Sequence, residues 1–294
     1  MRFIHLTDLH LSNPGNARYL SKRALGLFSW NNRRKLQHDK KILENLIENV
    51  IADKPEIVVI TGDLVQLGTE NEILLAKKWL SRVFEKVPLM IVPGNHDNYA
   101  IDSFSYIANH WSEFIHINPD FPSVKRFGDL VLIGLMSAKP MPFWSAQGDI
   151  CAKQFDRLEG LLAQCKGKVV CLFLHHPPYL EGVNRRKSLK TPEKLRRLII
   201  DKHVTLVCHG HLHRNIEFDG LMPTRVFCTA SASACITDSC ASYRVFDIDS
   251  HSQGFKIQTM LKQVDLKSNL VDVINTKAWN VGPCEVNSES IVSG

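Results

Sequence analysis

The sequence predicts an α/β fold built as one domain, with a last third that is mostly β structure. Over the first two-thirds of the 294 residues, short apolar runs typical of buried strands alternate with longer segments whose apolar residues recur at helical spacing. After residue 221, three apolar or alternating runs follow one another with no helical segment between them, which indicates antiparallel strands. The composition, 44% hydrophobic and 22% charged, excludes a collagen-like, coiled-coil or disordered chain.

Strands are predicted where short apolar runs end at turn residues. Ile57–Ile60 consists of isoleucine and valine alone, and Pro88–Val92 stops at Pro93 and Gly94, which favour a turn. By the same criteria we expect strands at Arg2–Thr7, on both sides of Gly128 and Asp129 within Ser123–Met136, and at Lys168–Leu174, Val204–Cys208, Arg225–Thr229, Ala241–Ile248 and Phe255–Leu261.

Helices are predicted where apolar residues recur every three to four positions. Lys35–Ala52 carries such a face, which begins at Leu36, and Pro55 ends the segment. Thr191 is a favourable helix N-cap, and Pro192 suits the first helical position. The other helices expected between the strands are Thr69–Phe84 and Lys153–Gln164.

The chemical motifs run from residue 8 to residue 213, so they can act together only if this whole length folds as one unit. We therefore expect a single domain over residues 1–264, with an inserted basic amphipathic segment at 16–41. Residues 265–294 are expected to form a C-terminal extension whose polar end is disordered.

The eight cysteines form no C-x-x-C pair, and several lie inside apolar strand-like runs. We interpret them as reduced thiols in a cytoplasmic protein. No apolar run approaches the roughly 20 residues that cross a bilayer, and charges come too early for a signal peptide. Attachment to the membrane is therefore expected, if at all, as peripheral binding to its inner face.

Positive charge is concentrated in one segment. The net charge is +6, and the segment Arg18–Lys41 holds eight basic residues against one acidic residue, Asp39. A basic patch of this kind favours an anionic partner, such as a phosphate substrate, a nucleic acid or a lipid surface. The alternative interpretation is a solvated helix face.

Five short segments each follow an apolar strand and carry side chains that bind metals. In an α/β sheet the carboxyl ends of the strands share one edge, so we expect these segments to converge there. Residues two apart at a strand end face the same way, which applies to Asp8 with His10 and to His211 with His213. The side chains that could bind a metal are Asp8, His10, Asp63, Asn95, His175, His211 and His213.

These seven oxygen and nitrogen donors exceed the four of a structural zinc site and suit two divalent ions that share one carboxylate. Paired ions of this kind are suited to hydrolysing phosphate esters, because they activate a hydroxide and neutralise the charge that grows on the phosphate oxygens. The donor types fit Mn, which we expect, with Fe, Zn or Co as alternatives.

The blocks D-x-H, G-D, G-N-H-D, H-H-P-P and G-H-x-H, in this order, resemble the calcineurin-like metallophosphoesterase family. The resemblance covers residues 2 to about 260. It implies a four-layer α/β/β/α sandwich of two mixed sheets flanked by helices, which agrees with the pattern of strands and helices above.

The resemblance also implies a role for each residue of the blocks. The first metal is bound by Asp8, His10 and His213, the second by Asn95, His175 and His211, and Asp63 bridges both. His96 contacts the substrate phosphate, as does Asn95; His96 also protonates the leaving group, and Asp97 orients His96. Either His175 or its neighbour His176 could be the ligand; the family pattern favours His175 and leaves His176 to contact substrate.

The family pattern narrows the substrate. Protein phosphatases of this type continue the second block as G-D-x-V-D-R-G, whereas here the chain reads Gly62–Gly68 without the arginine. The G-N-H-D ending resembles the bacterial phosphodiesterase branch, including class III cyclic-nucleotide phosphodiesterases. The resemblance therefore implies a di-metal hydrolase in which a metal-bridging hydroxide attacks a phosphodiester or diphosphate that is small or lipid-linked.

The inserted segment 16–41 follows the first block directly, so it should border the metal site. Leu20, Ala24, Leu27 and Phe28 fall at helical spacing, with Trp30 as an aromatic anchor and basic residues around them. This pattern is typical of a helix on an anionic membrane surface. The alternative is that Leu27 and Phe28 pack the segment onto the rest of the protein.

A second basic loop, with Arg185 and Arg186, follows His176 and should reach the same edge, where both arginines would bind substrate. The two basic loops favour a lipid-linked anion, so a diphosphatase acting on acylated UDP-sugars at the membrane is one alternative function. A nuclease is a second, although no separate DNA-capping domain is visible and no specific nucleic acid is expected. A non-catalytic scaffold is a third, but retromer-type scaffolds of this family lose ligand residues that are all present here.

Overall fold

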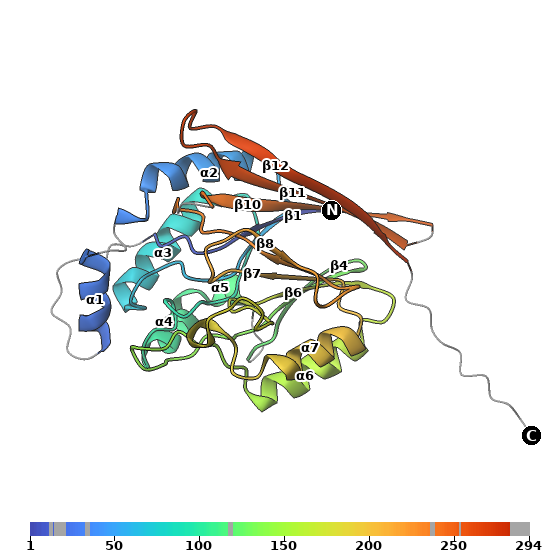
Figure 1. Ribbon diagram of the computed structural model, residues 1–294, viewed down its shortest axis with the longest axis horizontal. Helices are drawn as coiled ribbons and strands as arrows, with labels where there is room; N and C mark the ends of the chain where they lie inside the picture. The colour runs from blue at the N-terminus through green and yellow to red at the C-terminus, as the bar shows by residue number, and fades with distance from the viewer. Residues whose placement is uncertain are drawn as a thin grey trace, which may run out of the picture.

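The computed structural model describes residues 1–11, 14, 22–32, 36–116, 120–235, 239–252 and 254–282. In these residues two six-stranded mixed sheets lie between two layers of helices (Figure 1). The expected α/β/β/α sandwich is therefore confirmed.

The first sheet has the strand order β12-β11-β10-β1-β2-β3. One half of this sheet is parallel, because β2 pairs in parallel with both β1 and β3. The other half is antiparallel, from β1 through β10 and β11 to β12. The strands are β1 (Arg2–Leu6), β2 (Ile57–Ile60), β3 (Leu89–Ile91), β10 (Ser242–His251), β11 (Gly254–Val264) and β12 (Val271–Val281).

The second sheet has the order β4-β5-β6-β7-β9-β8, with antiparallel pairs only at its two ends. The strands are β4 (Ser123–Phe127), β5 (Leu130–Gly134), β6 (Val169–Phe173), β7 (Leu206–His209), β8 (Ile216–Phe218) and β9 (Arg225–Cys228). The prediction that the chain after residue 221 is antiparallel is only partly correct for β9, which pairs with β8 antiparallel but with β7 in parallel.

The described helices are α1 (Lys22–Asn32), α2 (Lys40–Ala52), α3 (Glu70–Val83), α4 (Ser103–His110), α5 (Ser112–Ile115), α6 (Ala152–Ala163) and α7 (Pro192–Asp201), with a short 3₁₀ turn, η2, at Arg185–Lys187. The capping box of α3 explains its start, because the Thr69 hydroxyl accepts a hydrogen bond from the backbone N–H of Glu72 while the Glu72 carboxylate accepts one from the N–H of Thr69.

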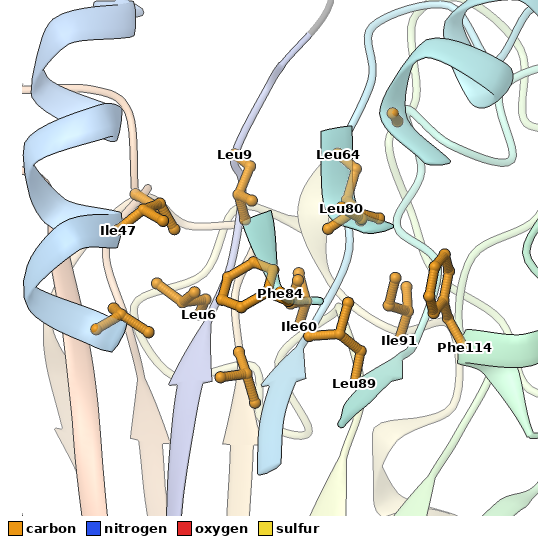
Figure 2. Packing of buried hydrophobic residues seen from close by; sticks show 14 of the residues in the cluster. Leu6, Leu9, Ile47, Ile60, Leu64, Leu80, Phe84, Leu89, Ile91 and Phe114 are labelled. Carbon is orange, nitrogen blue, oxygen red and sulfur yellow. The ribbon is translucent and has the colours of Figure 1, made fainter. Parts of the chain in front are cut away.

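The period of two along each strand decides which layer its side chains join. In β1 and β2, Leu6 and Ile60 face the helices, whereas Phe3 and Val59 face the second sheet. Figure 2 shows Ile47 of α2 and Leu80 of α3 among the side chains that meet Leu6 and Ile60. Helices α6 and α7 cover the outer face of the second sheet in the same way. Each such buried side chain contributes about 1.5–3 kcal/mol of transfer free energy.

Three sequence predictions need correction. Helix α2 begins at Lys40 rather than at Lys35, because Asp39 caps it, and Leu36 lies outside the helix with 87% of its surface exposed. Strand β8 and helices α4 and α5 were not predicted. Strand β12 was not predicted either: it lies in the expected C-terminal extension and pairs with β11 along the first sheet. Residues 283–294, expected to be disordered, lie outside the described residues.

Candidate metal centre

Two groups of three predicted ligands lie at the carboxyl ends of strands from both sheets. The first group is Asp8, His10 and His213, and the second is Asp63, His175 and His211. Within each group, one ligand atom of every residue lies within 4.8 Å of those of the others. The loops that carry them follow β1, β2, β6 and β7, so the convergence expected from the sequence is present.

Most of these residues have a left-handed backbone, which non-glycine residues adopt at a cost in free energy. Such strain persists where surrounding contacts impose it. Two contacts do so here, because the Asp8 N–H donates to Gly62 O at 2.9 Å and the His10 N–H donates to Asp63 O at 3.0 Å. The residues and their φ angles are Asp8 (53°), His10 (47°), Asp63 (53°), His211 (69°) and His213 (54°).

The two loops after β2 and β3 touch so closely that they require glycine. Gly62 has a φ of 90°, and a Cβ there would overlap the backbone of Gly94. A Cβ on Gly94 would in turn overlap the Asp63 carboxylate. These glycines therefore let the Asp63 loop and the Asn95 loop meet.

His175, and not His176, lies in the second group. Its Nδ1 is 2.6 Å from Thr61 O, and because a carbonyl oxygen can only accept, Nδ1 carries the proton. Its Nε2 then faces Asn95 Oδ1 at 3.1 Å and Asp63 Oδ2 at 3.3 Å. The predicted ligand Asn95 thus lies against the second group. An N–H to a carbonyl is the usual way in which a metal-binding histidine is oriented.

His176 lies beside this group but faces elsewhere. Its Nδ1 is 2.9 Å from Ser137 Oγ, and its Nε2 is 3.1 Å from Ala146 O. The side chain is fully buried. The contact that His176 makes in this structure is therefore with the loop around Ala146, and its expected contact with substrate stays a prediction.

The centre is electrostatically prepared for cations. Burial by itself would raise the pKa of Asp63, but His175 and His96 hold it well below its usual range. Asp8 also has a lowered pKa, since His213, 3.0 Å away, outweighs its burial. Burial lowers the pKa of His175, yet Asp63 and Asp8 raise it to about 9. Two buried, ionised carboxylates therefore attract positive charge to this place.

The donor set fits divalent ions. Among the described residues, both ring nitrogens of His10 and Nε2 of His211 are buried without a hydrogen-bond partner, which is costly unless something binds them. Carboxylate and imidazole donors without thiolates suit Mn, Fe, Zn or Co. The residues present therefore fit a pair of bound metal ions.

His96 and Asp97 lie next to the second group. The backbone N–H of His96 donates to Asp63 Oδ1 at 2.7 Å. The ring Nδ1 of His96 donates to Gln66 O at 2.7 Å, so the ring Nε2 is the nitrogen that can exchange a proton. The Asp97 carboxylate accepts from the N–H groups of Leu64 (2.8 Å), Val65 (3.0 Å) and Gly94 (2.8 Å). Asp97 thus ties the two loops that carry Asp63 and His96.

A cleft of about 510 Å³ opens beside His96 and Asn95. Of the two arginines predicted to bind substrate, Arg186 lines this cleft, whereas Arg185, on the same turn η2, is not among its lining residues. Lys22, which also lines the cleft, belongs to the basic segment that was expected to border the metal site. Sequence reasoning missed Gln66 and Lys139, because neither is one of the metal-binding side chains of the five blocks.

His38 is a further neighbour that the sequence did not identify. Its ring centroid lies 4.2 Å from that of His10 and 6.0 Å from that of His213, and its Nδ1 is 2.8 Å from Ser233 Oγ. Trp30 stacks on His38 and is 5% exposed. The prediction that Trp30 is an exposed membrane anchor is therefore wrong: it packs the inserted segment against the metal centre.

The rest of α1 divides between buried and exposed positions. Ala24 and Leu27 are half-buried, whereas Leu25 and Phe28 are 48% and 71% exposed. Leu20 lies outside the described residues. No helix in the described part of the chain is long and apolar enough to cross a bilayer.

Comparisons with known proteins agree with this geometry. A family model described as calcineurin-like phosphoesterase matches residues 1–215. A probable glycerophosphodiester phosphodiesterase of Arcobacter nitrofigilis is 26% identical over 224 residues, which cover 73% of this chain and 72% of that protein. A probable cyclic nucleotide phosphodiesterase of Vesicomyosocius okutanii is 25% identical over 193 residues, which cover 65% of this chain and 76% of that protein.

A solved structure shares the fold. A dimetal phosphatase from Danio rerio superposes with a TM-score of 0.66 at 12% identity, covering 95% of this chain and 98% of that one. The family model spans most of the chain and includes all five blocks that carry the donor side chains. The protein therefore belongs to the calcineurin-like phosphoesterases and is a metal-dependent phosphoesterase.

Proposed function

We propose that this enzyme is a phosphodiesterase with a two-metal centre. The observation that carries the proposal is that the two three-residue groups lie at one edge of the fold with Asn95 and His96 beside them. The names of two relatives, a probable glycerophosphodiester phosphodiesterase and a probable cyclic nucleotide phosphodiesterase, support diesters as the substrate class.

In this proposal the seven donors hold two divalent ions, of which Mn is our expectation. Asp8, His10 and His213 bind one ion, Asn95, His175 and His211 bind the other, and Asp63 lies between them. Ions at such sites stabilise charge on phosphate oxygens and activate water. The left-handed loops and their backbone hydrogen bonds fix the donors before any ion arrives, so little reorganisation is needed.

His96 has a proton-transfer role in this proposal. With Nδ1 held by Gln66 O, its Nε2 can contact the substrate phosphate and give a proton to the leaving oxygen. Asp97 acts indirectly, because it holds the Asp63 loop and the Gly94 loop in register through three backbone N–H groups.

Hydrolysis of bis(p-nitrophenyl) phosphate by the purified protein with Mn²⁺ tests this proposal. The Asp63→Asn variant should lose more than about 100-fold in kcat/KM, since even hydrogen-bond partners of metal ligands are worth 10–100-fold. Asp129→Asn is the matched control, because Asp129 is exposed in the turn between β4 and β5. Near-normal turnover by Asp63→Asn, or no turnover by the wild-type protein with any of Mn²⁺, Fe²⁺, Zn²⁺ or Co²⁺, would refute it.

A lipid-linked substrate at an anionic membrane surface is the second candidate. It is favoured by four exposed apolar side chains: Leu25, Phe143 and Trp144 line the basic cleft, and Phe28 lies on α1, the helix that carries Leu25. A Leu25→Asp, Phe28→Asp double variant should then lose co-sedimentation with anionic liposomes. Ile200→Asp on α7, also exposed, is the control. Equal sedimentation of all three proteins would exclude this candidate.

A further inference from the structure

The cleft beside His96 has walls from three separate segments. One wall is α1, which contributes Lys22, Leu25, Gly26 and Ser29. The second is the loop after β5, with Lys139, Met141 and residues 143–146, and the third is the turn η2 with Arg186 and Lys187. Asn95, His96 and Gln66 lie at the side of the metal centre. A substrate whose phosphate lies at His96 therefore extends between these walls.

Helix α1 is held against the body by one arginine and one glycine. The Arg23 guanidinium donates to both oxygens of Asp102, at 2.7 and 2.9 Å, and to the carbonyls of Leu67 and Gly68 at 3.1 Å. At Gly26 the helix comes so close to the body that a Cβ would overlap side-chain atoms of Leu67 and Tyr99. This wall of the cleft is therefore fixed rather than loosely tethered.

The cleft is strongly positive. Among the described residues that line it there are four cations and no carboxylate. Lys139 also pairs with Asp149, which lies outside the lining. Lys22 donates to Tyr99 O at 2.8 Å and lies 3.8 Å from the centre of that ring; burial and Arg23 lower its pKa to about 8, so it remains mostly protonated at neutral pH. Clustered positive charge in a recess concentrates anions there.

Two further features point to a bound organic anion. The Gln66 amide is 1% exposed, lines the cleft, and has no hydrogen-bond partner for either of its polar atoms among the described residues. Phe143 and Trp144, 61% and 60% exposed, form an edge-to-face pair 4.9 Å apart and line the same cleft. An unsatisfied amide and an exposed aromatic pair suit a ligand that has both polar atoms and a ring.

We propose that this cleft is a subsite for a second phosphate group, so that the preferred substrates are organic diphosphates that carry a ring. Lys22, Arg186 and Lys187 would bind the phosphate that is not attacked, and Phe143 and Trp144 would contact the ring. A single diester phosphate has one negative charge, which the metal centre can neutralise by itself. Three or four additional cations are then needed only for a further anionic group.

This inference rests on the proposed function and specifies which bond is cleaved. Water would form a bond to one phosphorus, and the bond from that phosphorus to the bridging oxygen would break. The second phosphate leaves with that oxygen and takes up a proton, so the products are two phosphate monoesters. The cationic subsite stabilises the charge on this leaving phosphate.

A matched pair of substrates tests the subsite. P1,P2-diadenosine diphosphate and adenylyl-3′,5′-adenosine carry the same rings; they differ by one phosphate and in whether a 5′ or a 3′ oxygen of one ribose is esterified. With the Mn²⁺-loaded wild-type protein, kcat/KM should be higher for the diphosphate. In the Arg186→Gln, Lys187→Gln double variant it should fall about tenfold or more for the diphosphate, and this loss should be at least about fivefold larger than the loss for bis(p-nitrophenyl) phosphate.

The control is Lys86→Gln, an exposed lysine just before β3 and so at the opposite end of the strands. It should leave both activities unchanged. The subsite would be overturned if the double variant lost the same factor in kcat/KM for the diphosphate and for bis(p-nitrophenyl) phosphate. It would also be overturned if the wild-type protein preferred adenylyl-3′,5′-adenosine to the diphosphate. Neither result would contradict the phosphodiesterase activity. Absence of bis(p-nitrophenyl) phosphate turnover in the wild-type protein would instead overturn the proposed function and the subsite with it.

Discussion

At the scale of single residues, the metal centre depends on side chains that are not themselves predicted ligands. His38 contacts the ring of His10 and, through Ser233 Oγ, the loop after β9. Ser231 Oγ donates to Asp8 O at 2.6 Å from the same loop. The inserted segment and this loop thus support the Asp8 to His10 turn, whose left-handed backbone needs support.

We predict that His38→Ala weakens Mn²⁺ binding by about tenfold, because the His10 ring loses a side chain packed against it that helps to orient the ligand. Calorimetric titration of the metal-free protein with Mn²⁺ measures this. His38→Asn, whose amide can keep the hydrogen bond to Ser233, should recover part of the affinity. His251→Ala, at the exposed end of β10, serves as the control. If His38→Ala binds Mn²⁺ as tightly as the wild-type protein, the ring contact has no supporting role.

At the scale of secondary-structure elements, α1 borders the cleft beside Asn95 and His96, next to the metal centre, as expected for the inserted segment 16–41. It lies at one end of the molecule, at the left in Figure 1, and docks through Arg23 and Gly26. The alternative that Leu27 and Phe28 pack the segment onto the body is wrong for Phe28, which is 71% exposed, whereas Leu27 is half-buried. Trp30 is buried instead, and Leu25 and Phe28 form an exposed apolar surface. The helix therefore serves as a wall of the cleft, and its exposed residues are the part available to a membrane.

Two glycines within helices give a matched pair of substitutions. Gly160→Ala on α6 meets nothing within 4 Å and should raise the free energy of unfolding by up to about 1 kcal/mol, the usual gain in helix propensity. Gly26→Ala gains the same helix propensity, but its new methyl group must displace the side chain of Leu67 or of Tyr99.

We expect Gly26→Ala to be less stable than Gly160→Ala and to raise KM for bis(p-nitrophenyl) phosphate, because the wall of the cleft moves. Urea unfolding and steady-state kinetics on the two variants check both points. The docking of α1 would be contradicted if the two variants were equally stabilised and had the same KM.

At the scale of the whole molecule, the two sheets are linked by a buried histidine. His5 lies on β1 in the first sheet, and its Nε2 is 2.8 Å from Oγ1 of Thr61, which follows β2. Its Nδ1 is 2.8 Å from Oγ1 of Thr229, which follows β9 of the second sheet. Burial, with the nearby His209 and Arg244, lowers the pKa of His5 from 6.5 to about 3. The folded protein therefore keeps His5 neutral over the range in which the unfolded chain protonates it.

Stability should consequently fall as the pH drops below about 6.5. Between that pH and about 3 the unfolded state binds one more proton at His5, which costs about 1.4 kcal/mol of unfolding free energy per pH unit. The test uses metal-free protein and His5→Gln, whose amide can still form hydrogen bonds to both threonines. Between pH 6 and pH 5 the unfolding free energy of this variant should fall by about 1.4 kcal/mol less than that of the wild-type protein. Urea unfolding at the two pH values measures it; parallel declines for the two proteins would contradict the assignment.

Much of the fold was predictable because it follows from local patterns. The buried runs of β2, β6 and β7 and the apolar faces of α2 and α3 show their periodicity directly in the sequence. Strand β12 was missed because it is exposed along most of its length and so has little apolar alternation; backbone pairing with β11 defines it. The parallel pairing of β9 depends on β7, which no local pattern reveals.

The sequence by itself determined the family and the donor side chains that meet, because each donor follows a strand in a short motif and all strand ends of one kind share an edge. Only the tertiary structure decided which of His175 and His176 joins the second group, since that depends on the carbonyl of Thr61. It also decided the place of His38, whose partner Ser233 is 195 residues away, and the basic walls of the cleft. Contacts between such distant segments are set by how the layers pack, and a linear pattern carries no record of that packing.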